Sequence, residues 1–155
     1  MTTHETTAWA IPSSLQDEHK QLHAELTEAT GAPGRVGAAA RAVADALHPH
    51  FVREEEIALP PLALLGELIR EGPTPVMREI LPLTDALNRE LPAMLKEHQV
   101  IGRALDELER VAREEDMGRY VDLAAKIRAH ALNEEQILYP AAILVGEFVR
   151  SRLDR

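Results

Sequence analysis

The sequence predicts an all-α protein, an antiparallel up-down four-helix bundle with an internal two-fold repeat of helical hairpins. Three observations indicate this fold. The 155 residues are rich in Ala and Leu and only 3% aromatic, and few stretches alternate with the period of a β-strand. Apolar side chains instead recur at helical spacing in four long segments joined by short breaks. The segment 50–67 also occurs again 80 residues later, at 130–147.

The two copies of this repeat share the residues that carry chemistry. Each copy contains a His followed four and five residues later by a Glu pair, and then a Pro, a Leu and a Gly-Glu dipeptide. A shorter pair of segments, DEHKQL around His19 and KEHQVI around His98, lies at almost the same offset. Two His-bearing segments, each present twice, predict two hairpins that face each other around a shared centre.

The first helix follows a short tail. Residues 1–12 are expected to form a flexible N-terminal tail, and residues 13–155 one domain. The helix should begin where Ser13 or Ser14 can cap its backbone N–H groups, and it should end at the GAPG break. Apolar and His residues recur along it at helical spacing, so its inward face carries His19 and His23.

The remaining helices show the same apolar spacing. A second helix from about Arg35 should bend or end at Pro60, because proline lacks a backbone donor and clashes one turn back. Residues 75–91 are expected to form an extra helical segment that joins the two halves. The third core helix carries His98, and the fourth carries the second copy of the repeat and kinks near Pro140.

Composition excludes several classes of function. The chain has no cysteine, which rules out disulfides, thiolate metal sites and Cys nucleophiles. A net charge of −9 disfavours nucleic acid as a partner, because phosphate binding needs a basic face. No apolar run is long enough to span a bilayer, and no signal peptide is evident. We therefore expect a cytoplasmic protein without a membrane partner.

Six side chains are expected to converge inside the bundle. Residues four apart return to nearly the same helix face, so His50 and Glu54 point inward together, as do their copies. Such polar groups are costly in an apolar core unless a cation compensates them. Imidazole nitrogens and carboxylate oxygens suit iron, zinc, manganese or copper, and two opposed carboxylates can each bridge two ions. The candidate metal ligands are His19, His50, Glu54, His98, His130 and Glu134.

Neighbouring residues have more than one expected role. Glu55 and Glu135 either reach the metal on a bent helix or hydrogen-bond the ligand histidines. His48 is expected at the surface or beside a ligand. Tyr139 could be a redox neighbour, but it lies roughly 13 Å along the helix from His130, so packing is expected for it.

The order His, His-x-x-x-Glu, His, His-x-x-x-Glu, with a proline after each Glu pair, resembles the hemerythrin family in its bacterial HHE cation-binding branch. The resemblance covers about residues 13–145. It implies a four-helix bundle that holds two iron ions with a bridging oxo or hydroxo group. The six candidate residues would be the ligands, with Glu54 and Glu134 as the bridges.

One position departs from the family pattern. The oxygen-carrying hemerythrins have two histidines four apart on the third helix, whereas here Gly102 follows His98 at that spacing. His23, four residues after His19, occupies the matching position of the other half. Either His23 is a seventh metal ligand or it is a hydrogen-bonding neighbour. In the first case one ion is held by His19, His23 and His50, and the other by His98 and His130.

An ion with fewer protein ligands keeps open positions, which suits the binding and activation of O₂ or peroxide. We expect a non-haem di-iron protein that handles O₂, peroxide or nitric oxide through sensing, scavenging, or catalase- or oxidase-like turnover. The alternatives are iron storage or sensing without catalysis, and a structural bundle held by zinc. A ferritin-like oxidase is less favoured, because its motif places Glu three residues before His. A homodimer contact is considered at the apolar segments after the prolines.

Overall fold

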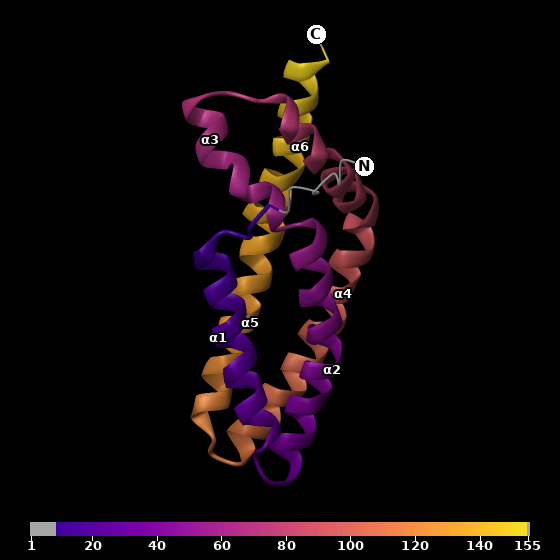
Figure 1. The fold of residues 1–155 in the computed structure, drawn as a ribbon. Helices are drawn as coiled ribbons and strands as arrows, with labels where there is room; N and C mark the ends of the chain where they lie inside the picture. The colour runs from indigo at the N-terminus through magenta and orange to yellow at the C-terminus, as the bar shows by residue number, and fades with distance from the viewer. Residues whose placement is uncertain (1–8, 155) are drawn as a thin grey trace, which may run out of the picture.

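The computed structural model describes residues 9–154, and the regular structure in this range is helical (Figure 1). Helix α1 contacts α2 and α5, and α4 contacts the same two helices, so the four surround a common core. The turns at 31–33 and 115–117 lie together at one end of the bundle. Successive long helices therefore run antiparallel, which confirms the predicted bundle. The four are α1 (Ser13–Thr30), α2 (Gly34–Ile57), α4 (Leu81–Glu114) and α5 (Gly118–Asn133).

The two hairpins are joined at the opposite end of the bundle. Helix α2 ends just before Pro60, as predicted, because a proline cannot donate the next backbone hydrogen bond. The predicted extra segment 75–91 is divided between a 3₁₀ turn and the first turns of α4. The connection consists of η1 (Pro60–Leu64), α3 (Leu65–Arg70) and η2 (Pro75–Ile80).

The fourth helix changes its winding before the predicted kink at Pro140. The N–H of Tyr139 bonds the carbonyl of Glu134, five residues back, and this widens one turn into a π-helix. The first copy of the repeat shows the same bond, from the N–H of Leu59 to the carbonyl of Glu54 at 3.0 Å. A bond that spans five residues therefore starts at the paired Glu in each copy, at the end of α2 in the first and inside the fourth helix in the second. The elements are α5, then η3 (Glu134–Leu138), then α6 (Tyr139–Leu153).

Buried apolar side chains fill the bundle on both sides of a polar layer. One cluster occupies the half near the two short turns and includes Leu47, Leu105 and Ile127. A second cluster lies beyond the layer and includes Ile57. Fully burying one such Leu or Ile stabilises the fold by roughly 1.5–3 kcal/mol. On α2, the polar residue Glu54 lies between Phe51 of the first cluster and Ile57 of the second.

Packing extends upstream of residue 13. Most of the predicted tail, residues 1–8, lies outside the described part of the chain, as does residue 155. Trp9 and Ile11 are partly buried and pack against apolar clusters near the joined end of the bundle. Within residues 9–154, no helix is both long and apolar enough to cross a membrane.

Helix α6 approaches the start of α4 closely at a glycine. A Cβ placed on Gly146 would lie 2.1 Å from Oγ1 of Thr84 and 2.6 Å from its Cβ. Thr84 is itself buried and donates a hydrogen bond to the carbonyl of Leu81. A Cβ on the repeat counterpart, Gly66, would meet only the side chain of Arg70, at 3.1 Å. The shared glycine is thus required for close packing in one copy only.

Candidate metal centre

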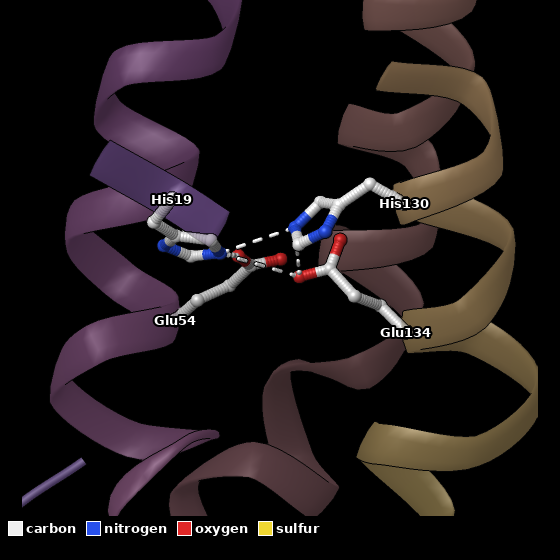
Figure 2. A group of neighbouring side chains, drawn as sticks. All are labelled: His19, Glu54, His130 and Glu134. Carbon is white, nitrogen blue, oxygen red and sulfur yellow. Dashed lines mark hydrogen bonds and ion pairs between the residues drawn. The ribbon is translucent and has the colours of Figure 1, made fainter. Parts of the chain in front are cut away.

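The six side chains predicted to converge do lie together in the middle of the bundle. All six are at least 92% buried. Figure 2 shows His19, Glu54, His130 and Glu134 pointing toward one another from helices on opposite sides. His19 comes from α1, His50 and Glu54 from α2, His98 from α4, His130 from α5, and Glu134 from the first residue of η3.

Their donor atoms form two groups that share both glutamates. Within each group, one donor atom of each residue lies within 4.8 Å of all the others. One group contains His19 and His130, whose Nε2 atoms are 3.1 Å apart. The other contains His50 and His98, whose Nε2 atoms are 2.8 Å apart. Two cation positions bridged by two carboxylates require this arrangement.

Each glutamate reaches one histidine of each group. Oε1 of Glu54 is 2.7 Å from Nε2 of His50, and its Oε2 is 3.3 Å from Nε2 of His19. Glu134 places Oε2 3.3 Å from His130 and Oε1 3.5 Å from His98. Among the described residues, Oε2 of both glutamates is buried without a hydrogen-bond partner. A buried carboxylate oxygen in that state is costly, so these atoms fit a bound cation.

The outer nitrogen of each histidine is held by a glutamate at the edge of the centre. These four glutamates are 37–49% exposed. A carboxylate accepts hydrogen bonds, so Nδ1 donates and Nε2 turns its lone pair toward the centre, as a metal ligand must. The Nδ1 to carboxylate distances are 3.2 Å for His19–Glu55, 2.5 Å for His50–Glu97, 2.8 Å for His98–Glu135 and 2.7 Å for His130–Glu18.

The electrostatics of the centre favour positive charge. Two Nε2 lone pairs that face each other at about 3 Å repel unless a proton or a metal ion lies between them. Burial lowers the pKa of His19 and of His98, but the carboxylates of Glu134 and Glu54 outweigh burial and raise each to about 10. Burial raises the pKa of Glu54, but the imidazoles of His19, His50 and His98 beside it hold that pKa well below its usual value. Bound metal ions would replace the protons.

The edge glutamates answer one question that the sequence left open. Glu55 and Glu135 hydrogen-bond histidines of the centre, which is the second of their two expected roles. Glu18 and Glu97 were not predicted. Their signal is present in the shorter repeat, where each directly precedes its histidine. A side chain at that position reaches a histidine on the neighbouring helix of the other hairpin, from α1 to α5 for Glu18 and from α4 to α2 for Glu97.

His23 lies apart from the centre. It is exposed on α1, its ring centroid is 5.9 Å from that of the exposed His48 on α2, and it belongs to neither group. Its position therefore does not support ligation. The predicted grouping of His19 with His50 also differs from the structure, because each pair joins a histidine of one hairpin to a histidine of the other. Neighbouring helices from different hairpins, α1 with α5 and α2 with α4, bring the paired rings together.

The expectation for Tyr139 was incomplete. The residue packs in an apolar cluster as predicted, but its hydroxyl also donates to Glu54 and lies 3.2 Å from Nε2 of both His50 and His98. In a regular α-helix a residue five positions after Glu134 points about 140° away from it. The wider π-turn brings Tyr139 back to that face, and long helical side chains lean toward the N-terminus.

Tyr139 makes the two groups chemically different. Its counterpart in the first copy of the repeat is Leu59, which is buried and has no polar group to offer. Burial and the charges of Glu54 and Glu134 raise the pKa of Tyr139 above its usual value, so the hydroxyl keeps its proton. Only the histidine pair of α2 and α4 therefore has a phenol beside it.

A helical bundle that presents four imidazoles and two shared carboxylates to two buried positions defines a metal-binding protein. A family model described as the hemerythrin HHE cation binding domain matches residues 11–142, a range that contains all six residues of the centre. The chain therefore belongs to the hemerythrin family, which confirms the resemblance seen in the sequence. Neither the curated proteins nor the solved structures gave a match to this chain.

Proposed function

We propose that this protein holds two iron ions with a bridging oxo or hydroxo group, and that the centre binds or activates O₂, peroxide or nitric oxide. The observation that carries the proposal is that Glu54 and Glu134 each belong to both donor groups. Membership of the family supports a bound cation. The donors are nitrogen and oxygen without sulfur, a set that suits iron among the transition metals.

The residues divide into ligands and supports. His19 and His130 would hold one ion, and His50 and His98 the other. The four edge glutamates fix the tautomer and the orientation of the imidazole rings. A pair of iron ions supplies redox chemistry and coordination positions that the protein leaves free for a small ligand.

The chain supplies a proton and a dry environment. Apolar clusters on both sides of the centre exclude water, which strengthens the electrostatic interactions inside. Oη of Tyr139 holds a proton within hydrogen-bonding distance of Glu54 and 3.2 Å from two histidines. The hydroxyl can donate a hydrogen bond to a small anion at the centre, which supports the binding of O₂ or peroxide there.

Metal analysis and an absorption spectrum test the proposal together. Protein made in iron-supplemented cells should contain about two iron ions per chain and show near-ultraviolet charge-transfer bands that respond to azide or peroxide. Colourless protein that contains zinc would contradict it and favour the structural bundle. Catalase- or oxidase-like turnover is measured on the same sample as loss of peroxide or of O₂.

Iron storage or sensing without catalysis is the second candidate. The observation that favours it is the ring of edge glutamates, which are partly exposed beside every histidine of the centre and can attract cations. In that case the iron content should follow the iron supply, and peroxide should not be consumed. Cytoplasmic location and a homodimer stay predictions from the sequence.

A further inference from the structure

Two surface grooves are related to each other by the internal repeat. The open groove, between α4 and α5, has a volume of about 400 Å³ and is lined by His98 and Glu135 among others. The filled groove, between α1 and α2, has a volume of about 30 Å³. Their lining residues correspond in the repeat: Leu105 with Leu26, Gly102 with His23, and Ala131 with Phe51.

Two small residues account for the difference in volume. Gly102 and Ala131 stand in the open groove where the filled groove has His23 and Phe51. A Cβ placed on Gly102 would have no atom within 4 Å, so the space beside it is empty.

The filled groove covers its histidine, and the open groove does not. The ring of Phe51 stacks flat on His19, with the centroids 4.0 Å apart and the planes at 10°. His98, the counterpart of His19, instead forms part of the wall of the open groove. It is 8% exposed, against 2–4% for the other three histidines of the centre. The open groove therefore ends at the metal centre.

We propose that the open groove is the route by which a small uncharged ligand such as O₂ or nitric oxide reaches the centre. The inference rests on the proposed function. Ile101, Leu105 and Leu132 give the groove apolar walls, which accept an uncharged diatomic molecule more readily than a hydrated ion. Phe51 and His23 close the equivalent route on the other side.

A third groove provides the matched control. It lies between α1 and α5, has a volume of about 360 Å³ and touches His130. Its lining includes Glu18, Gln21, Lys126 and Asn133 beside Leu22 and Ala129. The histidine at its inner end, His130, is 4% exposed, against 8% for His98 in the open groove. Ala129 is exposed in this groove and can receive the same bulky side chain as Ala131.

The test compares Ala131→Phe with Ala129→Phe in the iron-loaded, reduced protein, using nitric oxide in stopped-flow measurements. Ala131→Phe should slow both association and dissociation by about tenfold or more, because a plug raises the barrier in both directions. Its equilibrium dissociation constant, iron content and spectrum should stay unchanged. Ala129→Phe should change both rates by less than about twofold.

Normal binding with unchanged rates in Ala131→Phe would overturn the route, as would equal slowing by Ala129→Phe. If Ala131→Phe alters the iron content or the affinity for nitric oxide, Gly102→Leu is used instead, because it fills the groove from α4. The same changes in the association and dissociation rates are then expected. Iron-loaded wild-type protein that does not bind nitric oxide at all would contradict the proposed function itself. The two failures are therefore distinguishable.

Discussion

The hydroxyl of Tyr139 donates a hydrogen bond to the carboxylate of Glu54, which comes from the other copy of the internal repeat. The first copy has Leu59 at the corresponding position, so it cannot return a bond of this kind to Glu134. The two copies share one backbone bond there, since in both the carbonyl of the Glu accepts a hydrogen bond from the N–H five residues later. One side chain therefore distinguishes the two halves of the centre.

Tyr139→Phe removes the hydroxyl and keeps the ring. Loss of a buried hydrogen bond to a charged acceptor should lower the free energy of unfolding of the metal-free protein by about 1.5–3 kcal/mol. The charge-transfer spectrum of the iron-loaded protein should shift as well, because Glu54 loses its donor. Tyr120→Phe, at a buried tyrosine in the cluster near the short turns, should change stability by less than about 0.5 kcal/mol and leave the spectrum alone. Equal effects of both variants would contradict a specific role for Tyr139.

Glu55→Gln should weaken metal binding by about 10- to 100-fold, because an amide orients the imidazole of His19 less strongly than a carboxylate does. Competition with a coloured chelator measures the affinity. The adjacent Glu56 instead pairs with Arg53 at the surface, so Glu56→Gln should leave the affinity unchanged. Both variants remove one negative charge. If they weaken metal binding equally, the effect is one of net charge and Glu55 does not orient His19.

His19→Ala and His23→Ala form a matched pair four residues apart on α1. His19→Ala should lose at least one of the two iron ions per chain, because it removes a donor from one group. His23→Ala should keep both ions and the wild-type spectrum, since this ring lies at the surface beside His48. Plasma spectrometry measures the iron content of both variants. Loss of iron in His23→Ala would show that His23 is a seventh metal ligand, the first of its two expected roles.

Gly146→Ala should lower the free energy of unfolding by about 1–3 kcal/mol, because the new methyl group overlaps Thr84. Gly66→Ala, the same change in the other copy, should be neutral or stabilise the protein by up to about 1 kcal/mol, since alanine favours helix. Urea unfolding measures both. Adding Thr84→Ala to Gly146→Ala should recover part of the lost free energy of unfolding. If the effects of the two substitutions on this free energy simply add, the overlap is contradicted.

The sequence predicts most of the centre because its two signals, helical spacing and the internal repeat, do not depend on which helices become neighbours. The four-residue spacing of His50 and Glu54 fixes a shared helix face, and the repeat transfers that result to the second half. The partnership of His19 with His130 could not be predicted, because it depends on which helices of the two hairpins become neighbours. Tyr139 was missed for another reason: regular α-helix arithmetic does not include a turn that closes five residues back.

The pairing across hairpins has a consequence for how the centre is assembled. Each histidine pair takes one ring from residues before 60 and one from residues after 90, so a chain cut between α3 and η2 leaves neither fragment with a complete pair. An ion bound to either pair links the first hairpin to the second. Both groups also contain Glu134, so neither set of donors is complete until synthesis of the chain has passed that residue.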